Sequence, residues 1–208
     1  MAGALSRTPR TWLYQSDNRP VPARDDILAA ALTLFAGRGY DAVGVAEIVD
    51  DAGITKPTLY HHFGSKQGLL EAIVDGEGSL LLAALEEAAT YAGDLPLTLE
   101  RVVRAEFDFA VRHRSFVRML LALWFAPVDS EGYLRAERLH VRRHEILAAL
   151  FRAAAVHHGN LRGRQQTYAA TFLGMVNTYI GLALNGRVEL DEQLVHRAVK
   201  QFMYGIFA

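Results

Sequence analysis

The chain reads as a succession of amphipathic segments in which apolar residues recur every three or four positions, the spacing of an α-helix. Over residues 23–40, one helical face carries five apolar side chains: Ile27, Ala30, Ala31, Leu34 and Phe35. No long segment alternates apolar and polar residues, as a half-buried β-strand does. The pattern therefore predicts an all-α fold.

Glycine and proline residues divide this pattern into about nine helices. Two short helices, VAEIVDDAG and KPTLYHHF, follow the first, and Ala52-Gly53-Ile54 between them gives the spacing of a helix-turn-helix unit. Beyond Ser65 we expect six longer helices, over residues 65–91, 97–113, 115–125, 130–158, 163–185 and 191–206.

The short helix over 56–63 has an unusual surface for its length. Helical phase places Leu59 and Phe63 together on one face, where they anchor the helix. The other positions point outward and carry Lys, Thr, Tyr and His. Lys can donate to guanine, Thr can contact a thymine methyl or a phosphate, and Tyr and His suit the DNA backbone. The alternative is a solvated face on a small structural helix.

The next helix begins with a second candidate contact. Ser65 is a suitable N-cap and Lys66 lies in the first turn. Unpaired N–H groups, the helix dipole and a Lys side chain together favour a phosphate. We therefore expect Lys66 to bind the DNA backbone.

Residues 24–74 resemble the DNA-binding domain of the tetracycline-repressor (TetR) family, through ILAAALTLFAGRGYDAV, VAEIVDDAGITKPTLYHHFGSK and GLLEAIV. The resemblance implies a three-helix, homeodomain-like head on a larger helical domain. It also implies a dimeric repressor that binds a palindromic operator and is released by a small-molecule effector. It places eight residues at DNA: Gly44, Thr55, Lys56, Pro57, Thr58, Tyr60, His61 and Lys66.

The resemblance also divides the chain. We expect an N-terminal arm over 1–22, a DNA-binding domain over 23–68 with its helix-turn-helix motif at about 44–63, and an effector-binding and dimerisation domain over 69–208. The arm carries Arg7, Arg10 and Arg19, and it is either a frayed terminus or a contact to DNA.

Several glycines are unusual for the helices that contain them. Gly44 replaces the Thr or Ser usual in the family, and Gly68 stands where the family prefers a good helix former. Gly76 and Gly78 lower the helix propensity of the segment that links the two domains. This second pair indicates either close packing or a local kink, or else a more flexible helix that transmits effector binding to the DNA-binding domain.

The last two helices are candidates for dimerisation. Small residues fall along one stripe of the helix over 163–185, which would let another helix approach closely. In the family, the last two helices pair with those of a second subunit. The expected interface residues are Ala170, Gly174, Gly181, Leu194, Ala198, Val199 and Phe202. The alternative is that both helices complete the core of a monomer.

The resemblance implies an effector pocket among the middle helices, mostly apolar with a few polar groups. Large apolar side chains from several helices could line it, and His140, Asn177 and Tyr179 could supply polar groups. The candidate lining residues are Phe107, Met119, Leu123, Trp124, Tyr133, His140, Phe172, Met175, Asn177 and Tyr179. We expect a largely apolar effector.

The amino-acid composition limits which kinds of site, partner and location fit this chain. The chain has 208 residues, a formal net charge of -1 and no cysteine, which excludes disulfides, thiolate metal sites and a Cys nucleophile. Residues 1–66 carry seven Lys and Arg against seven Asp and Glu, so we expect few neutralised phosphates and a moderate salt dependence. No run approaches the roughly 20 apolar residues of a membrane span, and the N-terminus lacks a signal-peptide pattern, so we expect a cytoplasmic protein.

Other functions fit the sequence less well. No phosphate loop or nucleophile elbow indicates an enzyme, and the adjacent His61 and His62 point about 100° apart on a helix. Glu137, His140 and His144 have adequate metal-ligand spacing, but the segment RAERLHVRRHE is typical of a solvated face. We expect no cofactor and no metal. A helical adaptor that binds protein rather than DNA remains the alternative.

Overall fold

The computed structural model describes residues 24–205, which fold into nine α-helices and one short 3-10 helix. This confirms the predicted all-α fold; the predicted arm over 1–22 lies outside the described residues. The helices are α1 (Arg24–Arg38), α2 (Val45–Asp51), α3 (Lys56–Phe63), α4 (Lys66–Ala88), α5 (Leu95–Arg112), α6 (Arg114–Trp124), α7 (Glu131–Ala154), η1 (Gly159–Leu161), α8 (Gln165–Leu184) and α9 (Glu192–Tyr204).

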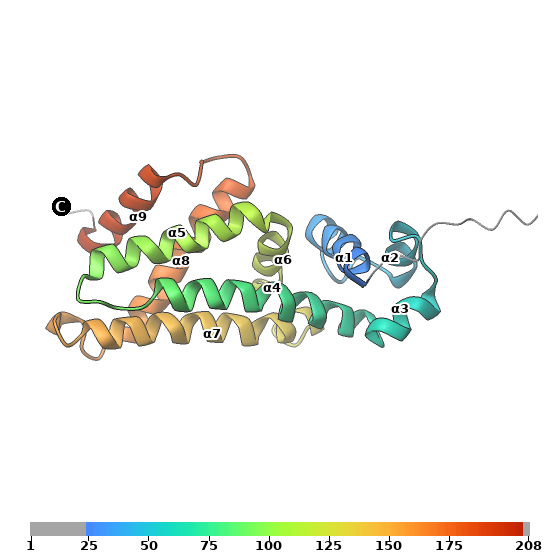
Figure 1. Ribbon diagram of the computed structural model, residues 1–208, viewed down its shortest axis with the longest axis horizontal. Helices are drawn as coiled ribbons and strands as arrows, with labels where there is room; N and C mark the ends of the chain where they lie inside the picture. Colours follow the sequence, from blue (N-terminus) through green and yellow to red (C-terminus); the bar gives the residue numbers. More distant parts are fainter. Residues whose placement is uncertain (1–23, 206–208) are drawn as a thin grey trace, which may run out of the picture.

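The first three helices form a compact head at one end of an elongated molecule (Figure 1). Helix α1 packs on α2, and α3 packs on both α2 and α4. Helix α4 is 23 residues long; it begins in this head and continues without a break along the rest of the molecule. The predicted domain boundary between residues 68 and 69 therefore falls inside one continuous helix.

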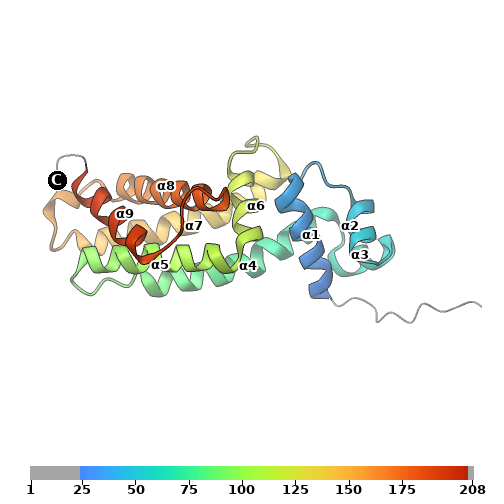
Figure 2. The same cartoon turned by 90° about the horizontal axis from the view of Figure 1, so that it is seen from above.

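The remaining helices form a larger body in which α4 and α7 run side by side (Figures 1 and 2). Helix α5 packs on α4, α8 packs on α7, and α9 packs on α5. Helix α6 lies between this body and α1 of the head (Figure 2). The head thus meets the body through the continuous α4 and through the packing of α1 against α6, among other contacts.

The end of α1 shows how local sequence sets these junctions. Gly39 has a φ of 86°, in the left-handed region that glycine adopts readily, and its N–H donates to Phe35 O at 2.9 Å. The ring of Tyr40 then packs edge-on against Phe35, with ring centroids 5.1 Å apart. The structure thus confirms the predicted glycine cap and the packing of Tyr40 back on the last turn of α1.

Several helix boundaries differ from the prediction by a few residues; α4, for example, ends at Ala88 rather than at residue 91. Helix α5 begins two residues early, at Leu95, because Pro96 fits the first turn and the Asp94 carboxylate accepts the N–H of Leu97 at 2.9 Å. Helix α7 ends at Ala154 rather than near 158, and a turn with η1 follows it. In the described part of the chain, no helix combines the length and hydropathy needed to cross a membrane.

Candidate functional site

Helix α3 exposes a polar face above a buried anchor. Thr55 caps the helix, with its Oγ1 accepting the N–H of Thr58 at 3.4 Å. Leu59 is fully buried, as predicted, whereas Phe63 is only partly buried and lies under the guanidinium of Arg24. Burial of Leu59 fixes the rotation of α3, so the polar side chains beside it face solvent.

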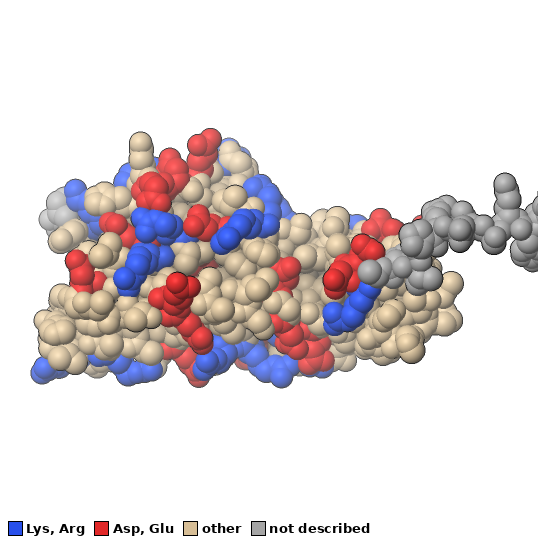
Figure 3. Space-filling view, in the orientation of Figure 1, with Lys and Arg blue, Asp and Glu red and all other residues tan. Residues whose placement is uncertain are grey.

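The structure leaves every predicted DNA-contact residue accessible. Thr58 and Lys66 are partly exposed, and the other six are exposed: Gly44, Thr55, Lys56, Pro57, Tyr60 and His61. The face shown in Figure 3 carries interspersed basic and acidic groups over the body, while the end formed by the head is mostly uncharged.

The side chain of Lys66 packs against the head rather than pointing freely into solvent. Its amine lies 4.1 Å from the ring centroid of Tyr40, in a cation–π arrangement. Burial lowers the pKa of Lys66, because desolvation penalises the charged form, while the carboxylates of Asp41 and Glu131 oppose that change. Ser65 caps α4, as predicted, with its Oγ accepting the N–H of Gly68 at 2.9 Å.

The two unusual glycines of the head have different structural reasons. A Cβ at Gly68 would lie 2.0 Å from the backbone oxygen of Phe63, so this position admits only glycine at the present packing of α3 on α4. Gly44 is the N-cap of α2, and its N–H donates to the carboxylate of Glu47 at 3.1 Å. That hydrogen bond, followed by one from Arg38, lowers the pKa of Glu47.

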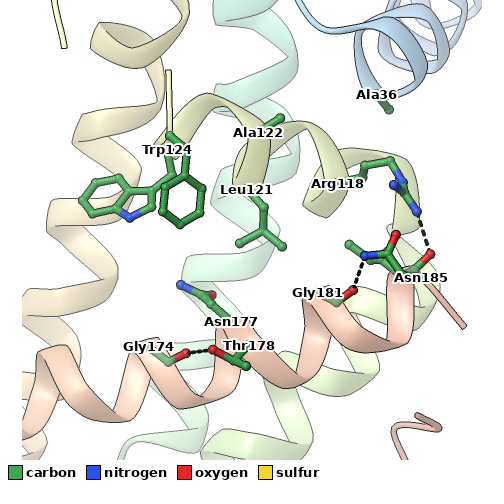
Figure 4. Close-up of a pocket in the computed structure, with 12 residues that line it drawn as sticks. Ala36, Arg118, Leu121, Ala122, Trp124, Gly174, Asn177, Thr178, Gly181 and Asn185 are labelled. Carbon is green, nitrogen blue, oxygen red and sulfur yellow. Dashed lines mark hydrogen bonds between the residues drawn. The ribbon is translucent and has the colours of Figure 1, made fainter. Parts of the chain in front are cut away.

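A groove of about 640 Å³ lies between α6 and α8 and reaches α1 of the head (Figure 4). Leu121 and Trp124 of α6 lie over the helix that carries Gly174 and Asn177 (Figure 4). The groove exists because Gly174 and Gly181 present no side chains beneath α6. Its lining residues are Ala36, Arg118, Leu121, Ala122, Trp124, Phe125, Gly174, Asn177, Thr178, Gly181, Leu184 and Asn185.

Two arginines hold α6 against the end of α8. Arg114 and Arg118 each donate through Nη2 to the backbone oxygen of Leu184, at 2.7 and 2.6 Å. This carbonyl belongs to the last turn of α8, where helix geometry leaves it without a partner inside the helix. Neither arginine was among the residues predicted from the sequence, although their i, i+4 spacing in the mostly apolar RSFVRMLLALW could have indicated them.

Of the ten predicted effector residues, only Trp124 and Asn177 line the groove. Four are packed in the core with no more than 5% of their surface exposed: Phe107, Met119, Leu123 and Phe172. Tyr133 stacks on Trp124, and Met175 is partly buried against the core. Tyr179 donates through its hydroxyl to Gln201 of α9 at 3.0 Å. Size and hydrophobicity alone could not separate core residues from groove residues.

A buried ion pair connects α5, α7 and α8 beside the groove. Arg143 donates to both carboxylate oxygens of Glu106, at 3.3 and 2.8 Å, and both side chains are almost fully buried. Its Nη2 also lies 3.3 Å from Oδ1 of Asn177, a groove residue. This ion pair was not predicted from the sequence, because Arg143 lies in a densely charged segment that suggested solvent exposure.

His140 is also buried, with its ring centroid 4.2 Å from that of Trp124. Burial, followed by the charge of Arg143, lowers the pKa of His140 to about 3, so the imidazole is neutral near pH 7. The interpretation of this helix as one solvated face was therefore wrong at His140 and Arg143. Within residues 24–205, no three metal-ligating side chains gather closely enough to hold an ion.

The predicted dimer residues divide into two groups. Leu194, Ala198 and Val199 of α9 are at most 4% exposed and lie in the core of their own chain, as the monomer-core alternative requires. Phe202 is partly buried among Phe151, Tyr168 and Phe172. Ala170 and Gly174 of α8 face solvent, and Gly181 is partly exposed. Among the predicted set, mainly the α8 residues remain accessible to a partner.

The arrangement of α1 to α4, with a short exposed helix following a glycine turn, defines a helix-turn-helix protein. Residues 27–73 match the family described as bacterial regulatory proteins, tetR family. The matched residues, in α1 to α4, are thus similar to the DNA-binding domain of this family.

Comparisons with individual proteins agree. The chain is 39% identical over 92 residues to the HTH-type transcriptional activator FasR of Mycolicibacterium smegmatis, and 34% identical over 97 residues to the HTH-type transcriptional repressor KstR2 of the same species. These matches cover 44% and 47% of the chain, and 42% and 47% of the two regulators. The chain thus matches less than half the length of these relatives.

Similarity to solved structures extends over the body as well as the head. PfmR, a TetR family regulator from Thermus thermophilus, is 28% identical with a TM-score of 0.71 over 88% of this chain and 97% of that one. FadR from Bacillus subtilis, in complex with stearoyl-CoA, is 17% identical with a TM-score of 0.73 over 88% and 100%. The second likeness concerns the fold alone.

Proposed function

We propose that this protein is a transcriptional regulator that binds a palindromic operator as a homodimer and responds to a small-molecule effector. The division into a DNA-binding domain over 23–68 and an effector and dimerisation domain over 69–208 belongs to this proposal. The observation that carries it is the exposed polar face of α3 above the fully buried Leu59, within a head that matches the tetR family. The named relatives include an activator and a repressor. The resemblance favours repression, and a reporter assay tests the sign.

The proposal makes a prediction about readout by α3. Lys56 lies at the N-terminal end of the helix, which enters the major groove in helix-turn-helix proteins, and it is exposed. We expect Lys56→Ala to weaken binding by about tenfold and to relax preference at one or two base positions. Tyr60→Ala should weaken all sequences about equally, because a backbone contact carries no base preference.

Fluorescence anisotropy with DNA fragments selected from the parent genome, at two salt concentrations, measures both effects. Glu137→Ala, on α7 of the body, is a control that should leave binding unchanged. Equal losses at every site for Lys56→Ala would remove its role in base recognition. A chain that binds no duplex, or that stays monomeric at all concentrations, would favour the protein adaptor instead.

The groove between α6 and α8 is the proposed effector site. Its walls combine Leu121, Trp124 and Phe125 with the polar Asn177 and Arg118, which suits a ligand with a long apolar part and one polar end. The groove also includes Ala36 of α1, so a bound ligand would touch the head directly. Because FadR from Bacillus subtilis holds stearoyl-CoA, acyl-CoA thioesters are the first class to test.

We expect Ala122→Trp, which fills the groove from its exposed α6 edge, to weaken acyl-CoA binding about tenfold or more. Ala149→Trp places the same side chain on an exposed position of α7 outside the groove and should leave binding unchanged. Calorimetric titration with thioesters of increasing chain length measures the affinities. If Ala122→Trp binds as tightly as the parent chain, the effector site lies elsewhere.

A further inference from the structure

The first turn of α7 reaches from the body into the head and holds the side chain of Tyr40. The Tyr40 hydroxyl donates to Oε2 of Glu131, the first residue of α7, at 2.5 Å. Tyr40 is 3% exposed. Burial, followed by the carboxylate of Glu131, raises the pKa of Tyr40 well above its usual range, so the phenol keeps its proton and remains the donor.

The ring of Tyr40 also contacts Lys66, the residue expected to bind a DNA phosphate. The amine of Lys66 lies 4.1 Å from the Tyr40 ring centroid, so the ring acts as a platform for the charge. Among the contacts of residues 24–205, no carboxylate within ion-pair distance holds the Lys66 amine in another place. The Tyr40 ring is therefore the direct contact that positions the Lys66 amine, while the charges of Asp41 and Glu131 act on it from beyond ion-pair distance.

Close packing around Gly132 connects the Tyr40 ring to helix α6 of the body. A Cβ at Gly132 would lie 2.6 Å from Leu123 and 3.5 Å from Tyr40, so the first turn of α7 is packed closely between α6 and the head. Leu123 directly precedes Trp124, which lines the groove. A shift at the end of α6 would therefore press on the turn that carries Glu131.

We propose that Glu131 and Tyr40 position Lys66 for its DNA phosphate, so that the body sets the strength of a backbone contact made by the head. This inference rests on the proposed DNA-binding function and adds a specific residue pair to its regulation. Effector binding in the groove would act by displacing the first turn of α7, which moves the Tyr40 platform and withdraws the Lys66 amine. Glu131 and Tyr40 are positioning residues in this scheme, and neither needs to touch DNA.

Tyr40→Phe tests the inference with little change in packing, because it keeps the ring and removes only the hydroxyl. We expect it to weaken operator binding about fivefold, the size of effect that one hydrogen bond supports. Lys66→Gln should weaken binding about tenfold and make the salt slope shallower by about 0.9, the value for one phosphate. The double variant should bind no more weakly than Lys66→Gln alone, because both changes act on the same phosphate interaction.

Two further variants separate positioning from stability. Glu131→Gln retains an oxygen that can accept from Tyr40 and should retain most of the affinity, whereas Glu131→Ala should match Tyr40→Phe. Glu71→Gln removes the ion pairs of α4 with Arg135 and Arg138 at the same junction, without touching Tyr40, and should leave operator binding within about twofold.

Anisotropy over a salt series decides between the outcomes. An additive effect of Tyr40→Phe in the Lys66→Gln background, or full affinity of Tyr40→Phe beside a weakened Lys66→Gln, overturns the inference and leaves the proposed function intact. A parent chain without DNA binding removes the proposed function itself. Thermal unfolding of each variant establishes that the compared chains are folded.

Discussion

Glu106→Gln is expected to destabilise the fold by about 3–5 kcal/mol, the usual cost of removing one partner of a buried ion pair. Arg143 is 3% exposed, and Glu106 is the carboxylate to which it donates twice. With a neutral amide in place of the carboxylate, the guanidinium charge stays in an apolar core without compensation. Urea unfolding at fixed protein concentration measures the change as a lower midpoint.

The matched control replaces both partners. Glu106→Leu combined with Arg143→Met removes both charges and fills similar volume, and this pair should recover most of the stability lost by Glu106→Gln. Recovery identifies the unpaired charge as the cause. A double variant less stable than Glu106→Gln would instead show that the pair and Asn177 contribute net stability through their hydrogen bonds.

Gly68→Ala is expected to reduce operator affinity by about tenfold or more, a loss of about 1.4 kcal/mol of binding or greater. The added Cβ would lie 2.0 Å from the Phe63 oxygen, and a backbone atom cannot rotate away. Helix α3 must therefore shift relative to α4, which changes the angle at which its polar face meets a duplex. The overpacking should also cost about 1–3 kcal/mol of stability.

Gly76→Ala is the control in the same helix. A Cβ at Gly76 meets nothing within 4 Å, so alanine should stabilise α4 by about 1 kcal/mol and leave DNA binding unchanged. Denaturation and anisotropy on both variants compare the two positions. Gly68→Ala with normal affinity would show that α3 tolerates the shift. Gly78 is an intermediate case, since its Cβ would lie 3.1 Å from the side chain of Leu139 on α7.

The sequence predicted the head well, because its signals are local. The spacing of apolar residues placed α1, and Gly39, Thr55 and Ser65 marked helix ends that the structure confirms. A cap acts within three or four residues, so its partners can be read from the chain. Helical phase likewise placed Leu59 inside.

The candidate effector site was predicted poorly, because a groove depends on which side chains are missing. Trp124 and Asn177 line it, whereas Phe107 and Phe172, equally suitable by type, fill the core. The small residues of α8 suggested a helix partner, yet Gly174 and Gly181 also form the groove floor. Which of two apolar faces is covered depends on the crossing of helices far apart in sequence.

The helices, their caps and the polar face of α3 could be predicted from the chain, since each depends on neighbours within one or two turns. Three other features arise from packing between distant helices: α9 buries Leu194, Ala198 and Val199 in its own chain, Arg143 pairs with Glu106, and Glu131 holds Tyr40 beneath Lys66. These contacts join residues that are distant along the chain. Their existence depends on how the helices pack, which no local pattern specifies.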